Sequence, residues 1–189
     1  MDLTLIRHGQ TDWNRDRRLQ GATDIQLNNT GREQARAAAA RLNDSFDVVV
    51  SSPLGRAQET AQLLAEGLNA PRGGVFEAIT ERGFGEAEGA TREDVAERWP
   101  DGLYPGMETR EETLERGLRG LEEIALAHPG QNVLAVSHGA LIRLVASELR
   151  GTQHGPLDNL ATVRLRRTAE GWSVLPAEGA GEDGKRASA

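Results

Sequence analysis

The chain has 189 residues, 38% of them hydrophobic and 27% charged, which predicts one globular domain without a membrane-spanning segment. Its net charge of -7 argues against nucleic acid as a partner. The absence of cysteine excludes disulfides and thiolate metal sites and, with no secretory signal at the N-terminus, leads us to expect a cytoplasmic protein.

The first predicted element is a buried strand over residues 3–6, which ends abruptly at Arg7, His8 and Gly9. Arginine offers two parallel donors to a phosphate or carboxylate, and histidine can serve as acid, base, nucleophile or metal ligand. Glycine at the strand end would let a ligand approach the backbone closely. An ordinary strand with a polar cap has the same pattern, so this stretch alone does not distinguish structure from function.

Residues 10–21 show no hydrophobic period and are predicted to form a long loop, which directly after a histidine is more often functional than idle. Asn14 could donate its side-chain amide to an anion. Arg15, Arg17 and Arg18 add positive charge to an acidic protein, although we expect at least two of the three to be ordinary solvent-facing residues.

The second buried strand is predicted over residues 46–50 and is preceded by a helix. Thr30 and Glu33 have the spacing of a capping box at the start of this helix, which runs to Leu42. The helix is very rich in alanine, a strong helix former.

Ser52 is expected to cap the helix after this strand, with Pro53 at the first position and the end near Leu68. Arg56 then lies in the first turn, where the helix dipole disfavours a cation. Because the free N–H groups of that turn attract anions, a bound anion shared with Arg56 explains this residue better than a solvent-facing role does.

Residues 71–74 are predicted to form a turn and residues 75–79 a short strand. The glycine-rich loop that follows carries three carboxylates, Glu81, Glu86 and Glu88. One of them could be a general acid, and Glu81 is placed just past the predicted strand; alternatively, all three are solvated loop charges.

Thr91 and Asp94 have the spacing of a second capping box, which opens a short helix to Trp99. The Pro- and Gly-containing connector after this helix holds Tyr104 and Met107. These aromatic and methionine side chains could form a substrate wall, or they could pack the connector down, and the sequence favours neither.

A core-facing amphipathic helix is predicted over residues 109–128. Its hydrophobic positions are Leu114, Leu118, Leu121, Ile124 and Leu126.

The third strongly buried strand, residues 132–136, leads into Ser137, His138 and Gly139 and then into a helix over residues 140–149. The chain thus repeats its opening pattern of buried strand, histidine and glycine. A lone histidine in this position would more often be a satisfied core residue than a catalyst. Two such units in one chain favour a functional site.

Residues 160–166 and 171–175 predict a final antiparallel hairpin, and the Gly-, Ala- and charge-rich tail over residues 176–189 is expected to be disordered. Strands followed by helices predict an α/β domain over residues 1–175: a three-layer sandwich with a mostly parallel central sheet and helices on both faces. Ligands bind such sheets beyond the carboxyl ends of the strands, where both histidines fall.

Four blocks of residues, in this order and spacing, resemble the histidine phosphatase superfamily, which includes the cofactor-dependent phosphoglycerate mutases. The resemblance covers residues 1 to about 166. The blocks are Arg7-His8-Gly9-Gln10-Thr11 with Asn14; Ser52-Pro53-Leu54-Gly55-Arg56-Ala57 with Glu59-Thr60; Glu81 with Phe84-Gly85 and Glu88-Gly89; and Ser137-His138-Gly139.

The resemblance implies that His8 attacks phosphorus to form a phosphohistidine, while Glu81 protonates the departing alkoxide and then helps to activate water. Catalysis would also use the cations that surround the phosphoryl group, so that no metal or cofactor is expected. The implied phosphate-binding set is Arg7, Asn14, Gln20, Gly21, Arg56, His138 and Gly139, of which Arg7, Arg56 and His138 would also be catalytic.

The resemblance leaves the acceptor of the phosphoryl group open. The mutases are longer and close over a bisphosphorylated cofactor, whereas this chain has only residues 82–112 as a lid. Gln10-Thr11 and the stretch from Gln20 to Asp24 look more like the phosphatases. We therefore expect a phosphatase acting on a small phosphorylated metabolite, with a mutase as the alternative. An inactive phospholigand-binding protein is less favoured because His8 and Glu81 are both present, and a homodimer stays open.

Overall fold

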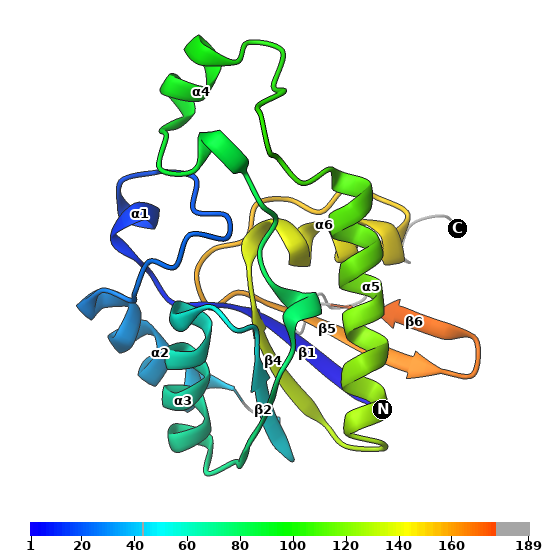
Figure 1. The fold of residues 1–189 in the computed structure, drawn as a ribbon. Coiled ribbons are helices and arrows are strands. Elements are labelled where there is room, and N and C mark those ends of the chain that lie inside the picture. Colours follow the sequence, from blue (N-terminus) through cyan, green and yellow to red (C-terminus); the bar gives the residue numbers. More distant parts are fainter. Residues whose placement is uncertain (43, 177–189) are drawn as a thin grey trace, which may run out of the picture.

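A computed structural model describes residues 1–42 and 44–176. In this part of the chain a six-stranded sheet forms the centre of the molecule, with strand order β3-β2-β4-β1-β5-β6 (Figure 1). The first four strands are parallel to one another, and the last two form an antiparallel hairpin beside β1. The strands are β1 (Asp2–Arg7), β2 (Val48–Ser51), β3 (Arg72–Val75), β4 (Val133–Ser137), β5 (Thr162–Thr168) and β6 (Gly171–Val174).

Helices cover both faces of this sheet, which confirms the predicted three-layer fold. Helices α2 and α3 pack on one face, and α5 and α6 pack on the other (Figure 1). The short helices lie in the loops around the site. The bounds are α1 (Asp12–Arg15), α2 (Asn29–Arg41), α3 (Gly55–Leu68), α4 (Arg92–Arg98), α5 (Arg110–Ala127) and α6 (Gly139–Arg150), with 3-10 turns η1 (Glu77–Ile79) and η2 (Gly85–Ala87).

The hydrophobic strands are buried on both faces because successive side chains point to opposite sides of a sheet. In β1, Leu5 belongs to the core cluster with Leu121 of α5, whereas Ile6 belongs to the cluster with Leu64 of α3. Full burial of each such side chain contributes about 1.5–3 kcal/mol. The continuous hydrophobic run in the sequence therefore reflects two covered faces rather than a buried helix.

Two predicted helix caps are wrong. The N-cap of α2 is Asn28, whose side chain accepts a hydrogen bond from the Gly31 amide, and not the predicted Thr30. Ser52 does not cap α3, whose first amide, that of Gly55, donates instead to the Asp24 carboxylate over 2.8 Å. The Asp24 contact comes from the loop after β1 and is not contained in any local pattern, whereas Asn28 is a local candidate two residues before Thr30. The backbone amide of Asn28 also donates to the Gln10 carbonyl of the loop after β1.

The predicted turn at 71–74 and strand at 75–79 are also wrong, since the former is largely strand β3 and the latter is mainly the 3-10 turn η1. Glycines suit β3 because a Cβ on Gly73 would lie 2.7 Å from a methyl group of Val48 on the neighbouring strand. Ile79 turns into the core beneath α5. The prediction for α5 holds except at Leu126, which is 76% exposed and points away from the core.

A segment of the chain between Phe84 and Met107 projects beyond the carboxyl ends of the parallel strands and carries α4 at its tip (Figure 1). An isolated β-bridge joins Phe84 to Met107 and closes its base. This segment falls within the predicted lid. Of the tail expected to be disordered, residues 177–189 lie outside the described part of the chain. No described helix is long and hydrophobic enough to cross a membrane.

Candidate active site

The two strand-histidine-glycine units are neighbours in the sheet. Strands β1 and β4 pair in parallel with Arg7 opposite Ser137, so the next residue of each strand, His8 and His138, emerges at the same level. The centroids of the two imidazole rings are 5.2 Å apart, and the ring planes are tilted by 55°. The repeated pattern in the sequence is therefore one site built from two adjacent strand ends.

His8 is held as one tautomer by its own loop. Its Nδ1 lies 2.7 Å from the Gly9 carbonyl oxygen, which can only accept, so Nδ1 carries the proton and Nε2 keeps a free lone pair. Gly9 is required sterically, because a Cβ there would lie 2.6 Å from the Gly31 carbonyl oxygen. The Asn159 amide donates to the His8 carbonyl over 2.9 Å and fixes the other side of this loop.

Both histidines are electrically neutral near pH 7. Burial lowers the pKa of His8 well below its ordinary value, and the cations of Arg56 and Arg7 lower it further. Burial also lowers the pKa of His138, with added repulsion from Arg56, His8 and Arg7. A neutral imidazole with a free Nε2 is the form of histidine that acts as a nucleophile.

Two arginines bring positive charge beside His8. Arg7 ends β1 and donates from Nη1 to the Leu157 carbonyl over 2.6 Å. Arg56 is fully buried in the first turn of α3, as the sequence predicts, and donates from its two terminal nitrogens to the carbonyls of Thr23 and Gly21, each over 2.7 Å. Burial lowers the pKa of both guanidinium groups, and nearby Glu81 raises it.

The loop over residues 20–24 holds the Arg56 side chain in place through its backbone carbonyls. Glu88 holds this loop by accepting hydrogen bonds from the backbone amides of Ala22 and Thr23, over 3.0 and 2.9 Å. Gly21 contributes its carbonyl to Arg56, and Gln20 is buried with its side-chain oxygen accepting from the Thr11 hydroxyl. Glu88 is thus a structural carboxylate among the three that the sequence leaves as candidates.

Glu81 is placed at the N-terminus of α6. Its carboxylate accepts hydrogen bonds from the amides of Ala140 and Leu141, over 3.2 and 3.1 Å, where the helix dipole favours a negative group. Arg116 fixes the backbone before it by donating to the carbonyls of Ala78 and Thr80. Glu81 therefore follows the 3-10 turn η1 and does not lie at the end of the predicted strand.

His138 is oriented by a serine that the sequence assigns to a helix cap. The Ser52 hydroxyl lies 2.6 Å from His138 Nε2, which leaves His138 Nδ1 directed elsewhere. Gly139 follows as the first residue of α6, and a Cβ there would lie 3.3 Å from Arg7 Nε. Small side chains at these two positions let the histidine and the arginine share one narrow space.

Buried polar atoms without partners gather in this space. Five buried side-chain nitrogen or oxygen atoms of the described residues have no hydrogen-bond partner, and three of them belong to the site: Arg7 Nε, Arg56 Nε and His138 Nδ1. Buried donors are nearly always paired in folded proteins, so such a cluster indicates a place for an anionic ligand. We call Arg7, His8, Arg56, Glu81 and His138 the floor of the site.

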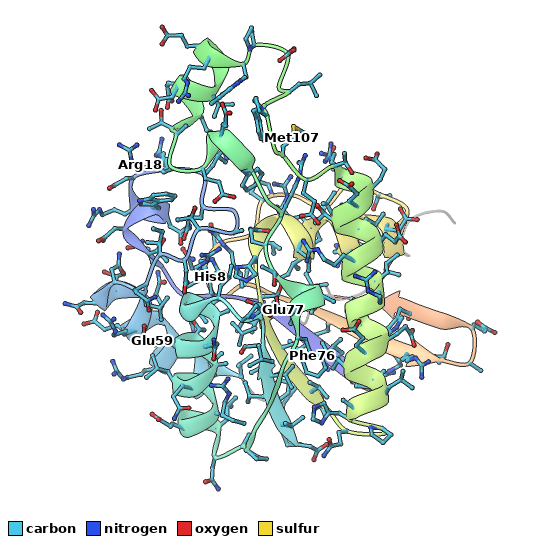
Figure 2. The ribbon with its side chains drawn as sticks, viewed as in Figure 1. His8, Arg18, Glu59, Phe76, Glu77 and Met107 are labelled. Atoms are coloured by element: carbon cyan, nitrogen blue, oxygen red, sulfur yellow. The ribbon has the colours of Figure 1, made fainter. Side chains whose placement is uncertain are left out.

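An open cavity of about 460 Å³ leads to the floor between α1 and α4, and its lining includes Arg7 and Asn14. Asn14 accepts hydrogen bonds on its side-chain oxygen from the Thr11 amide and, over 3.3 Å, from Asn159. The side-chain nitrogen of Asn14 therefore points away from Thr11 and Asn159. His8 is buried, and in Figure 2 it lies near the centre of the view, with Arg18 and Met107 above it toward the segment that carries α4.

The aromatic residues of the lid contact one another. The ring of Tyr104 packs edge-on against Trp99 at 5.7 Å and lies 6.5 Å from Phe84, and its amide donates to the Met107 sulfur. Of the two interpretations that the sequence leaves open, these contacts favour packing of the connector over a substrate wall.

Comparison with known proteins shows the family of the chain. A family model of the histidine phosphatase superfamily, branch 1, matches residues 3–177. The chain belongs to this superfamily. It is an enzyme of the histidine phosphatase type, and its fold is the one that the resemblance in its sequence implies.

Relatives of this histidine phosphatase include both hydrolases and mutases. It is 40% identical to the uncharacterized phosphatase PhoE of Bacillus subtilis (strain 168), over 90% of each chain. It is 34% identical to the 2,3-bisphosphoglycerate-dependent phosphoglycerate mutase 2 of Gloeobacter violaceus, over 78% of this chain and 74% of the mutase. A mycobacterial glucosyl-3-phosphoglycerate phosphatase has a similar structure, with a TM-score of 0.80, 28% identity and coverage of 92% and 96%.

Sequence reasoning missed the residues that orient this histidine phosphatase site: Ser52 in that role, Asn159 and Arg116. Ser52 lies inside a recognised motif, so the motif is the signal that could have found it. Asn159 and Arg116 carry no local signal, because each acts on backbone carbonyls that are distant in the sequence.

Proposed function

We propose that the protein is a metal-independent phosphomonoester hydrolase that acts through a phosphohistidine on His8. One observation carries the proposal: the free Nε2 of a neutral, buried His8 lies in a site where the Nε donors of Arg7 and Arg56 and the Nδ1 of His138 are buried without partners. A phosphoryl group at this place would accept hydrogen bonds from both arginines, and also from His138 Nδ1 in the tautomer whose Nε2 accepts from the Ser52 hydroxyl, and it would meet the nucleophile at the same time.

In the first step His8 Nε2 attacks phosphorus, and the bond from phosphorus to the ester oxygen breaks. In this step the Glu81 carboxyl group gives a proton to the departing oxygen. The phosphorylated imidazole is cationic, and its Nδ1–H stays bonded to the Gly9 carbonyl. Arg7 and Arg56 stabilise the charge spread over the equatorial phosphoryl oxygens.

In the second step water attacks phosphorus from the side that the alcohol has left. The Glu81 carboxylate takes a proton from this water, the phosphorus–nitrogen bond breaks, and His8 returns to the neutral imidazole. Inorganic phosphate then leaves through the cavity above Asn14. The same groups serve both steps, and no cofactor is part of the proposal.

Water is favoured over a second substrate hydroxyl as the acceptor. The entrance of the cavity is bordered by the exposed residues Arg17, Arg18 and Arg92, so the cavity is open to water above Arg7. A mutase has to retain a bisphosphorylated intermediate away from water. The identity of 40% over nine tenths of the Bacillus phosphatase also supports hydrolysis.

The test is hydrolysis of p-nitrophenyl phosphate by the wild-type chain and by His8→Ala, each with EDTA present. We expect turnover that survives EDTA and disappears in the variant, together with a base-stable, acid-labile phosphoryl label on the wild-type chain after rapid quenching. Tight vanadate binding without turnover would point to the inactive binding protein. Bisphosphoglycerate-dependent conversion of 3-phosphoglycerate to 2-phosphoglycerate would point to the mutase.

A further inference from the structure

A largely buried ion pair between Arg116 of α5 and Glu108 lies beside the segment that carries Glu81. Nε and Nη2 of Arg116 each donate to the Glu108 carboxylate over 2.9 Å, so the contact is bidentate. Burial by itself would raise the pKa of Glu108, but the hydrogen bonds from Arg116 and from the Gly83 amide outweigh it and lower that pKa. The pair is therefore ionised near pH 7.

Arg116 uses its remaining donor capacity on the backbone that leads to Glu81. Its Nη1 donates to the carbonyls of Ala78 and Thr80, over 3.0 and 2.8 Å. Its Nη2 also donates, over 3.4 Å, to the carbonyl of Glu81 itself. One planar guanidinium thus holds three carbonyls of the same short segment while it binds a carboxylate, which a lysine cannot do.

Glu108 holds the chain on the other side of Glu81. Its carboxylate accepts a hydrogen bond from the Gly83 amide over 3.1 Å, and its backbone amide donates to the Gly83 carbonyl over 2.9 Å. The Glu108 carbonyl accepts from Nε of Arg82 over 2.8 Å. The two members of the ion pair therefore hold residues 78–83 from both sides of Glu81.

The position of the Glu81 carboxylate depends on this backbone. In the described part of the chain, every hydrogen bond that the carboxylate accepts comes from a backbone amide, on Arg82, Ala140 or Leu141. No side chain there orients it directly. A proton donor has to stay within hydrogen-bonding reach of the departing oxygen, and a displacement of about 1 Å can cost roughly 10²-fold in rate.

We propose that the Arg116–Glu108 pair positions Glu81 for proton transfer, an inference that rests on the role of Glu81 in the proposed function. Among the described contacts, the pair forms no hydrogen bond with the arginines or histidines of the floor. Glu108 also directly follows the bridge between Phe84 and Met107, so the pair joins the base of the lid to the acid. Loss of the pair should slow protonation of the alkoxide and leave phosphate binding nearly unchanged.

Two conservative variants, Arg116→Lys and Glu108→Gln, test the proposal with two leaving groups. Lysine keeps the positive charge, part of which is felt by His138, but loses the fork. We expect kcat/KM for glycerol 3-phosphate to fall by about tenfold or more in each variant, and that for p-nitrophenyl phosphate by less than about threefold. The inhibition constant of inorganic phosphate should not change. Because both esters are measured on one preparation, the ratio of their kcat/KM values does not depend on the fraction of folded enzyme.

Arg119→Lys is the matched control on the same helix. Arg119 lies about one turn after Arg116 and forms an exposed ion pair with Glu123 over 3.5 Å. Its ratio of kcat/KM values for the two esters should equal that of the wild type. An unchanged ratio in Arg116→Lys and Glu108→Gln, or the same change in Arg119→Lys, would overturn the proposal.

A double-mutant cycle with Glu81→Gln shows whether the pair acts through Glu81. Once residue 81 is glutamine, Arg116→Lys should cost nothing further for glycerol 3-phosphate. Losses that add in the double variant would assign the pair to another role and refute the inference. If Glu81→Gln itself affects both esters equally, the acid role in the proposed function fails. A selective loss in Glu81→Gln without one in Arg116→Lys refutes the positioning role alone.

Discussion

The floor and the cavity entrance, which is bordered by Arg17, Arg18 and Arg92, are both rich in positive charge, but they hold it differently. In the floor, each arginine is anchored on the main chain: Arg56 on two carbonyls and Arg7 on one, beside a histidine kept neutral by burial. At the entrance, Arg17 and Arg92 are exposed and lack such anchors among the described contacts. The floor is thus preorganised for one geometry, as transition-state stabilisation requires, whereas the arginine side chains of the entrance are not.

The largest expected effect comes from removing the nucleophile of the floor. His8→Ala should lower kcat for p-nitrophenyl phosphate by about 10⁵-fold or more, because no other group of the floor can form the covalent intermediate. Circular dichroism and thermal unfolding would show that the variant is folded. Residual turnover within 100-fold of the wild type would contradict the covalent role of His8 and the view that the floor is preorganised around it.

The second effect separates proton donation from phosphate binding in the floor. Glu81→Gln should lower kcat/KM by roughly 10²–10⁴-fold for an alkyl phosphate such as glycerol 3-phosphate, whose alkoxide leaves only with a proton. The loss for p-nitrophenyl phosphate should be far smaller, because phenolate leaves unaided. Equal losses on both substrates would mean that Glu81 acts only through its contacts with α6.

The third effect is the stability of the folded chain in acid. The pKa of His8 and of His138 is lowered in the folded state, so the unfolded chain binds more protons below about pH 6.5. The free energy of unfolding should therefore fall as the pH drops below 6.5, by about 1.4 kcal/mol per pH unit for each histidine, and should not depend on these groups above it.

Urea unfolding at pH 8, 7, 6 and 5 would measure this dependence. His138→Gln should halve the slope between pH 6 and pH 5. A flat curve in this range would show that the two histidines are not buried in neutral form. Most carboxylates titrate nearer pH 4 and contribute little here.

The smallest of these effects concerns the orientation of His138. Ser52→Ala removes the hydroxyl that lies 2.6 Å from Nε2 and should lower kcat by about tenfold. Ser51→Ala is the control, since it removes the same oxygen one residue earlier, where the partner is Arg72. A similar loss in both variants would assign Ser52 to general packing.

Strands with continuous hydrophobic runs were predictable, because burial on both faces leaves a strong pattern in β1, β2 and β4. The site residues placed at strand ends followed from them, as His8 and His138 show. Predictions failed where polar groups decide local structure. Asp24 caps α3 from a loop that is remote in the sequence, and no local propensity encodes that contact. Asn28 caps α2 through a local contact with Gly31, so this error was a choice between two neighbouring candidate caps.

The sequence by itself identified the chemical groups of the candidate site. Two strand-histidine-glycine units and an arginine at a helix start specify the groups, because each depends on local spacing alone. Only the tertiary structure decided whether these groups are charged and how close together they lie. The pairing of β1 with β4 places the ring centroids of His8 and His138 5.2 Å apart, and burial makes both rings neutral. Arg17 and Arg18 line the cavity, whereas Arg15 is paired with Asp12. Burial and distance are sums over many remote residues, which no short stretch of sequence contains.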